Sequence, residues 1–330
     1  MASSMGVLWL DGRDASIRLR CPACGAGVRA RDEVRWHCDD PSMPHSFPLV
    51  DGVPILLNAQ RSIFRFEDFK PRARTTFKEP SGWALRIGRM LPSPSRDLST
   101  VPCYRRLADA LRQRPAGRRR VLVVGCGDGT AGYGELLGVE GVEMLETDVS
   151  LAGSARIVCD ASDLPFEAEQ FDLVICVAVL EHVLEPQRCV DEIHRVLRED
   201  GFVYATMPFM QQVHMGEYDF TRLTRSGLRW LFREFSLIDT GISTGPASAL
   251  IWSVQHFVLS FTSSVGGRRV AKALIRLLLG WMTWLDVGLA RRAPALDAAA
   301  GFYFVGRRAA AATVSARDLI AYYRGGDALK

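Results

Sequence analysis

A glycine-rich turn directly after a short apolar run is the feature that most constrains this chain. Residues 121–130 read VLVVGCGDGT. The apolar run is typical of a strand buried on both faces of a parallel sheet, and Gly125 permits a sharp exit from it. Gly127 and Gly129 lack a Cβ, so a ligand is able to approach the backbone closely. A helix expected from near Ala131 would direct its amide ends at an anionic group of that ligand.

Strand and helix patterns alternate from residue 120 onward. Besides 121–125, the candidate strands are 142–148, 155–160, 171–179, 201–209, 235–243 and 301–308. The candidate helices are 103–113, 186–200 and 224–235. Repeated alternation of this kind indicates a doubly wound α/β sheet.

Acidic residues stand where the two strands after the glycine turn are expected to end. Asp148 lies about 20 residues past the turn, where a carboxylate accepts both hydroxyls of a ribose. Asp160, followed by Ala161, closes the next strand, and a carboxylate there is able to bind an adenine amino group. Taken singly, Asp148 also fits a helix N-cap and Asp160 a turn residue. The sequence predicts that together they line one crevice at the switch point of the sheet.

Residues 120–240 resemble the class I S-adenosylmethionine-dependent methyltransferases of the broad methyltransferase-11 type. The matching stretches are VVGCGDGT, ETDVS, CDASDLPF, FDLVICVAVLEHV and EIHRVLREDGFVYATMPF. A dinucleotide site is disfavoured, because Thr130 stands where that pattern requires its third glycine. The resemblance implies a Rossmann-like, doubly wound sheet of seven strands, in which the last strand, GFYFVGRR, inserts antiparallel.

The resemblance also assigns the contacts of the cofactor, S-adenosyl-L-methionine. It places Gly125, Gly127 and Gly129 at the methionine part, Asp148 at the ribose, Asp160 and Ala161 at the adenine, and Val177 at the reactive end. The chain departs from the family pattern in two respects. Asp200-Gly201 stands where a glycine pair is common, and only the short stretch SLAGSARIV separates the two acidic residues. We therefore expect the intervening helix to be shortened or absent and the adenine side to be more open.

The loop after the fifth strand of the domain offers candidate catalytic residues. Residues 208–228 hold His214, Asp219 and Arg222 and resemble a loop found in methyltransferases that often accompany sugar and polysaccharide pathways. We interpret His214 as a general base and Arg222 as a clamp for an anionic group. The alternative is structural, since Asp219 and Arg222 at i, i+3 also suit an ion pair or a helix cap.

A second polar pair, Glu181 and His182, follows the fourth strand. Strand ends on this side of the sheet face the predicted crevice, so the pair is placed to contact a substrate. The alternative is that His182 is a structural histidine with satisfied hydrogen bonds.

The N-terminal segment carries a possible metal site. Cys21-Pro-Ala-Cys24 is half of a zinc knuckle, and Cys38 follows at a distance typical of zinc ribbons. His45 is the expected fourth ligand, because its loop is long enough to close a tetrahedral site, whereas His37 directly adjoins Cys38. A degenerate ribbon without metal is the alternative.

This segment has its own resemblances. HSFPLVDGVPILL resembles the end of short zinc-ribbon proteins of the Trm112-like type. A Cys-x-x-Cys…Cys…His arrangement also precedes the methyltransferase domain in large-subunit rRNA guanine methyltransferases. The resemblance implies a small zinc-ribbon-like module ahead of the main domain, folded around a structural zinc ion.

Composition divides the chain into three regions. Residues 1–58 form the zinc-ribbon-like module, and residues 59–100, rich in Arg, Pro and Ser, form a linker with one short helix near 83–90. Residues 101–330 form the methyltransferase domain, which carries a helical insertion at 244–300.

The helical insertion contains long apolar helices within 249–290. Polar residues interrupt both, so neither offers 18 consecutive apolar residues and a membrane-spanning helix is not expected. We favour a helical cap packed on the sheet. The alternative is an apolar substrate tunnel or a peripheral membrane contact, because Trp281 and Trp284 lie beside basic residues.

Charge and cysteine usage limit the class of protein. The formal net charge of +4 falls short of a dedicated nucleic-acid binder. The first 14 residues show no cationic start followed by an apolar run, and the eight Cys are too scattered for a secreted disulfide scaffold, so a cytoplasmic protein is expected.

We therefore weigh three functions. The favoured one is methylation of a small-molecule or glycan-type acceptor. The second is an RNA methyltransferase that grips RNA through its N-terminal module, where several Arg surround Trp36. The third is a non-enzymatic interaction protein that keeps the fold.

Overall fold

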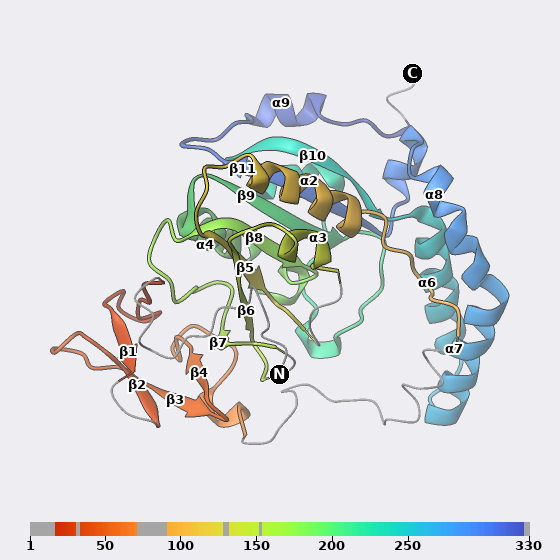
Figure 1. Ribbon diagram of the computed structural model, residues 1–330. Coiled ribbons are helices and arrows are strands. Elements are labelled where there is room, and N and C mark those ends of the chain that lie inside the picture. Colours follow the sequence, from red (N-terminus) through yellow and green to blue (C-terminus); the bar gives the residue numbers. More distant parts are fainter. Residues whose placement is uncertain (1–16, 31–33, 71–90, 128–131, 152–153, 327–330) are drawn as a thin grey trace.

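One continuous sheet forms the centre of the molecule in the computed structural model (Figure 1). The structure describes residues 17–30, 34–70, 91–127, 132–151 and 154–326. The sheet order is β1-β2-β3-β4-β7-β6-β5-β8-β9-β11-β10. Its N-terminal strands are β1 (Val28–Ala30), β2 (Arg35–Cys38), β3 (Ser46–Val50) and β4 (Val53–Leu56). The others are β5 (Arg119–Val124), β6 (Val142–Asp148), β7 (Ile157–Cys159), β8 (Phe171–Val177), β9 (Leu197–Pro208), β10 (Phe235–Thr244) and β11 (Gly301–Arg308).

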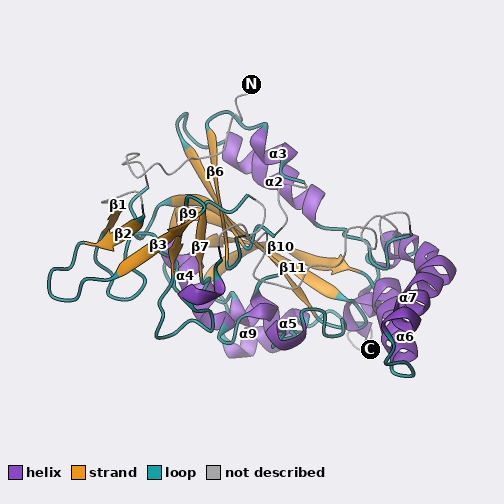
Figure 2. Ribbon diagram, turned by 90° about the horizontal axis from the view of Figure 1, so that it is seen from below, coloured by secondary structure: helices purple, strands orange, loops and turns teal. Residues whose placement is uncertain are grey.

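Helices cover both faces of this sheet, as Figure 2 shows. On one face lie α2 (Thr100–Arg112) and α3 (Gly134–Leu137), and on the other α4 (Pro186–Val196), α5 (Arg225–Leu231) and α9 (Ala316–Ala321). Beyond one end of the sheet lie α6 (Pro246–Leu259) and α7 (Val265–Leu279), followed in the chain by α8 (Asp286–Leu289). Short 3-10 helices are η1 (Phe66–Asp68), η2 (Leu180–His182), η3 (Gly216–Tyr218), η4 (Gly280–Trp284) and η5 (Ala293–Asp297). The predicted doubly wound α/β architecture is confirmed.

The number of strands in the sheet differs from the prediction. The sheet has eleven strands, of which β5 to β11 are the seven expected and β1 to β4 are additional. They join because β4 pairs in parallel with β7, Ile55 lying opposite Val158 and Leu56 opposite Cys159. The N-terminal segment therefore extends the main sheet, and the boundary expected at residue 58 does not separate two sheets.

The strand order reverses beside β5. Its two parallel neighbours are β6 on one side and β8 on the other, which makes the carboxyl end of β5 the switch point where open α/β sheets bind ligands. At the far side, β11 pairs antiparallel with both β9 and β10, as predicted for GFYFVGRR.

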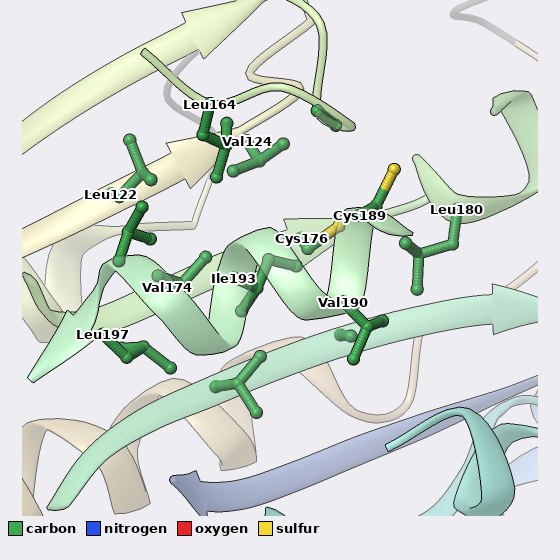
Figure 3. Close-up of a cluster of buried hydrophobic side chains, with 14 of the residues drawn as sticks. Leu122, Val124, Leu164, Val174, Cys176, Leu180, Cys189, Val190, Ile193 and Leu197 are labelled. Atoms are coloured by element: carbon green, nitrogen blue, oxygen red, sulfur yellow. The ribbon is translucent and has the colours of Figure 1, made fainter. Parts of the chain in front are cut away.

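The packing of α4 shows how the core supports this switch point (Figure 3). Cys189, Val190 and Ile193 form the buried stripe of α4 and belong to one core cluster with Val124 of β5 and Cys176 of β8. The spacing of these α4 side chains is that of one helix face.

The same helix ends earlier than predicted. The expected helix ran from 186 to 200, but Leu197 takes extended backbone and pairs with Phe171 at the start of β9. Pairing with the sheet therefore replaces the last turn of the expected helix.

Helices α6, α7 and α8 lie within the segment 244–300, and a buried carboxylate anchors the start of α6. Asp286 accepts hydrogen bonds from the backbone amides of Ala247 (2.8 Å) and Ser248 (3.0 Å) at the start of α6. A Cβ on Gly245 would lie 2.3 Å from the Asp286 carboxyl carbon, so this close approach requires glycine. Within the described residues, no helix has both the length and the hydropathy needed to cross a bilayer. The short helix expected near 83–90 lies outside the described residues.

Candidate cofactor and acceptor site

A cavity of about 720 Å³ opens at the carboxyl ends of the central parallel strands. Its walls include six of the seven predicted cofactor residues, together with Cys126. The six are Gly125, Gly127, Asp148, Asp160, Ala161 and Val177. The volume suits a small-molecule site, and the position is the switch point of the sheet. Gly129 lies outside the described residues.

The described glycines of the turn fit a close-approach cradle. Gly125 has φ +73°, and a Cβ there would lie 2.3 Å from a methyl of Val179. Gly127 has φ +55°, and no atom lies within 4 Å of the place where its Cβ would stand. Both conformations favour glycine, and the open space beside Gly127 is free for a ligand. The following helix, α3, begins at Gly134 and has one turn, later than the expected start near Ala131.

Asp148 is anchored to the glycine turn. Its Oδ2 accepts a hydrogen bond from the Gly127 amide (2.8 Å), and its Oδ1 accepts one from the Ser150 amide (3.0 Å). Burial raises the pKa of its carboxyl, and these amides oppose that shift. Each oxygen has a further lone pair, so the side chain is able to accept two more hydrogen bonds from a ligand in the cavity.

Asp160 is held by contacts that the sequence did not predict. Its Oδ2 accepts a hydrogen bond from the Ser62 hydroxyl (2.7 Å), and its Oδ1 accepts one from the Ser162 amide (3.0 Å). The described residues between β6 and β7 contain no helix, in agreement with the shortened connection. A segment expected to be a linker therefore reaches Asp160 at the wall of the cavity.

Other residues of that expected linker also line the cavity. Arg61, Ile63 and Phe64 contribute to its wall, as do Asp97 and Thr100 at the end of the segment. No sequence signal pointed to them, because they belong to no motif and no periodic pattern. Only their place after β4, which enters the main sheet, brings them to the crevice.

Residues of the 208–228 loop and residues just after strand β8 form a compact polar cluster. His182 and His214 face each other, with their Nε2 atoms 3.1 Å apart. The Glu181 carboxylate lies 3.8 Å from the first Nε2 and 3.9 Å from the second. The Asp219 carboxylate lies 3.2 Å from Nδ1 of His214. The structure thus brings together the two polar groups that sequence analysis treated separately.

Arg222 completes the cluster from the outer side. Its guanidinium pairs with both carboxylate oxygens of Asp219, and its Nε also donates to the carbonyl of Gln211 at 2.9 Å. The ion pair considered as the structural alternative is therefore present. It holds Asp219, which in turn holds the His214 ring.

Burial sets the charge of these groups. It raises the pKa of Glu181 to about 7 and lowers the pKa values of His182 and His214. Burial also opposes ionisation of Asp219, but hydrogen bonds from Arg222 and the His214 amide outweigh it and lower that pKa to about 2. Both imidazoles are therefore neutral near pH 7 and present lone pairs rather than charge.

The predicted zinc ligands also converge. One ligand atom from each of Cys21, Cys24, Cys38 and His45 lies within 4.8 Å of the others, and the last two cysteine sulfurs are 3.3 Å apart. The buried Nδ1 of His45 has no hydrogen-bond partner. Three thiols and an orphaned imidazole nitrogen are a donor set that suits tetrahedral Zn²⁺.

Comparison with known proteins agrees with the fold. Residues 122–205 match the family model described as a methyltransferase domain. The match makes this part of the chain similar to methyltransferase domains, in agreement with the sequence motifs. It spans the glycine turn, both acidic residues and the Glu181–His182 pair.

Curated relatives cover the same part of the chain. A demethylmenaquinone methyltransferase of Clavibacter sepedonicus is 32% identical over 109 residues, which is 29% of this chain and 44% of that protein. A ubiquinone biosynthesis O-methyltransferase of Pseudomonas syringae pv. tomato is 32% identical over 99 residues, 26% of this chain and 43% of that protein. The chain thus spans less than half the length of these two relatives.

Solved structures are similar at a lower level. Phosphoethanolamine N-methyltransferase 2 of Haemonchus contortus, in complex with S-adenosyl-L-methionine, aligns with a TM-score of 0.40 and 17% identity. The alignment covers 62% of this chain and 52% of that one. This similarity is too low to carry an argument about activity.

Proposed function

We propose that the protein is an S-adenosyl-L-methionine-dependent methyltransferase that acts on a small-molecule acceptor. The carrying observation is the cavity at the switch point, in which Gly125, Gly127 and the anchored Asp148 stand together. The open space beside Gly127 supports this assignment, because a cofactor would pass there.

The residues of the cavity divide the binding of the cofactor among them. Gly125 and Gly127, with Gly129 by resemblance, bound the methionine part, and Asp148 accepts the ribose hydroxyls. Asp160, held by Ser62, and Ala161 meet the adenine, while Val177 borders the reactive end. The bound cofactor supplies a methyl group on a sulfonium, so the protein's own task is alignment at about 3–3.5 Å.

The acceptor side of the cavity favours a compact, partly apolar molecule. Val183, Leu184, Met215 and Tyr218 line it beside His182. Tyr218 stacks on Phe64 with ring centroids 5.6 Å apart, which ties the 208–228 loop to the expected linker. We propose a hydroxylated ring as the acceptor class, in line with the quinone-type names of the two relatives, ahead of a glycan. His214, with Asp219 and Arg222 behind it, is the proposed base for the hydroxyl proton.

The test of this function is cofactor binding followed by methyl transfer. Calorimetry should show binding of S-adenosyl-L-methionine to the wild-type chain. The Gly127→Val variant fills the open space and should lose at least tenfold in affinity. Gly288→Ala, where no atom lies within 4 Å of the added Cβ, is the matched control and should bind normally.

The outcomes separate the alternatives. If calorimetry detects no binding of S-adenosyl-L-methionine to the wild-type chain or to the Gly288→Ala control, the non-enzymatic interaction protein is favoured. Cofactor binding combined with salt-dependent retention of RNA would favour the RNA methyltransferase. Cofactor binding with transfer to a hydroxylated ring, and none to oligosaccharides, would support the proposal.

We further propose that the N-terminal cluster binds one structural zinc ion. Convergence of its four ligand atoms and the orphaned His45 nitrogen support this. Metal analysis of the purified chain tests it, with Cys24→Ser as the variant that should lose this ion.

We also propose that the helical insertion contacts an anionic membrane surface. Leu278, Trp281 and Trp284 are 68%, 59% and 67% exposed, and Lys272 is exposed on the same helical segment. Residues 246–285 contain no Asp or Glu. An exposed apolar face with cationic and without acidic residues suits the boundary of an anionic bilayer.

A second cavity borders this face and shares one lining residue with the cofactor cavity. It measures about 540 Å³, and Trp281 and Trp284 line it together with Asp97, which also lines the cofactor cavity. An apolar acceptor dissolved in a membrane would therefore reach the protein close to the site. Co-sedimentation with anionic vesicles should be lost in a Leu278→Glu, Trp281→Glu variant, while cofactor affinity stays unchanged. Binding that persists in this variant would contradict the membrane contact.

A further inference from the structure

The Glu181–His182–His214 cluster brings three potential metal-ligand atoms within 4.8 Å of one another. Nδ1 of His182 lies 2.6 Å from the carbonyl oxygen of Tyr218, so it must donate to it. Nδ1 of His214 lies 3.2 Å from the Asp219 carboxylate, whose negative charge favours a proton on that nitrogen. In neutral rings with the proton on Nδ1, both Nε2 atoms carry lone pairs. Two lone pairs point toward each other across 3.1 Å.

A buried carboxylate faces the same point. Glu181 is 1% exposed, and its Oε2 has no hydrogen-bond partner. Its Oε1 lies 3.8 Å and 3.9 Å from the two Nε2 atoms, beyond hydrogen-bond distance. A buried carboxylate with an unsatisfied oxygen is costly to ionise unless a cation compensates it.

The three separations define where a cation would sit. The two Nε2 atoms and Oε1 of Glu181 form a triangle with sides of 3.1, 3.8 and 3.9 Å. The point equidistant from these three atoms lies about 2.1 Å from each of them. That distance equals ordinary Zn–N and Zn–O bond lengths. The Tyr218 carbonyl beside Nδ1 of His182 and the Asp219 carboxylate beside Nδ1 of His214 are the kinds of outer contact that orient metal-binding histidines.

We propose that Glu181, His182 and His214 bind a divalent cation, Zn²⁺ by the chemistry of the donor set, beside the acceptor site. His182 lines the cofactor cavity, so the open coordination positions border the acceptor. This inference rests on the proposed function and refines its substrate class to an acceptor that reacts through oxygen.

The cation changes how the hydroxyl is activated. It lowers the pKa of an acceptor hydroxyl that contacts it, and the proton leaves to solvent. The oxygen electron pair then forms the bond to the methyl carbon while the carbon–sulfur bond breaks, leaving a neutral thioether. His214 acts as a ligand in this arrangement instead of accepting the proton itself.

Metal stoichiometry tests the site without any activity measurement. After removal and re-addition of Zn²⁺, the wild-type chain should bind two equivalents, Cys24→Ser one, His214→Ala one, and the double variant none. His256→Ala, on α6 with its Nδ1 bonded to Trp252, is the matched histidine control and should bind two. Co²⁺ should add a spectrum typical of nitrogen and oxygen ligands that only the His214 variant loses.

A specific result would contradict the proposed cation site. Unchanged zinc content and an unchanged Co²⁺ spectrum in His214→Ala would overturn the cation site. The His214 side chain is 23% exposed, so this variant should fold, and circular dichroism checks it. If cofactor binding persists while zinc content stays unchanged, the cation site fails and the methyltransferase function stands, with His214 as the base.

Discussion

At the scale of single residues, Asp148 has the most clearly defined task. Its carboxylate is anchored by the Gly127 and Ser150 amides and faces the cavity. Replacement by Asn keeps the size but removes the charge, so cofactor affinity should fall about 10- to 150-fold, the equivalent of about 1.5–3 kcal/mol. Calorimetry measures this loss, and the exposed Asp109→Asn should leave affinity unchanged.

The pH dependence of cofactor binding should also reflect the titration of Asp148. Burial raises the pKa of the Asp148 carboxyl, so it gains a proton at a higher pH than an exposed Asp. Cofactor affinity should therefore decline as the pH falls through that raised pKa, since the protonated carboxyl accepts ribose hydroxyls poorly. The Asn variant should lack this decline, and an equal decline in both chains would assign the effect to another group.

Motif residues were the part of the site that the sequence predicted best. A glycine turn and acids at strand ends have a physical reason at a fixed place in the chain, so Gly127, Asp148 and Asp160 were found. Ser62 and Phe64 were not, because their roles arise only when β4 pairs with β7. The same limit applied to the convergence of His182 and His214, which lie on separate segments.

At the scale of elements, the strands were predicted closely because buried parallel strands are continuously apolar. The sequence carried no sign that β4 would join them, since a short apolar run fits a separate module equally well. The ends of helices were predicted less accurately, as α4 shows. There, competition with strand pairing decided where the helix ended.

The attachment of the helical insertion gives a prediction at this scale. Asp286 is fully buried and caps α6 through two backbone amides and the Ser248 hydroxyl (2.7 Å). Asp286→Ala leaves these donors unpaired, so the free energy of unfolding should fall by about 2–3 kcal/mol. Urea denaturation followed by helix content measures it. The exposed Asp109→Ala should change stability by less than about 0.5 kcal/mol, and a similar small loss in Asp286→Ala would refute the cap.

At the scale of the whole molecule, the continuous sheet joins the N-terminal cysteine cluster to the cofactor cavity. Asn58, just after β4, is buried and donates from Nδ2 to the carbonyl of Pro22 within the Cys21–Cys24 knuckle (3.1 Å). Its own carbonyl accepts the amide of Ser62 (2.9 Å), and the Ser62 hydroxyl bonds Asp160 (2.7 Å). A short series of hydrogen bonds thus runs from the proposed zinc site to the Asp160 carboxylate at the wall of the cavity.

This connection predicts that zinc affects cofactor binding without touching the cofactor. Cys24→Ser should lose the structural zinc, release the knuckle from Asn58 and weaken S-adenosyl-L-methionine binding by about 3- to 30-fold, roughly one or two hydrogen bonds. Asn58→Ala should weaken binding to a similar degree while zinc content stays normal, because it breaks the same series at a later point. Met43→Ala, an exposed change in the same N-terminal segment, is the control. If Cys24→Ser loses its zinc and still binds the cofactor at wild-type affinity, the two sites are independent, and β4 joins them in structure only.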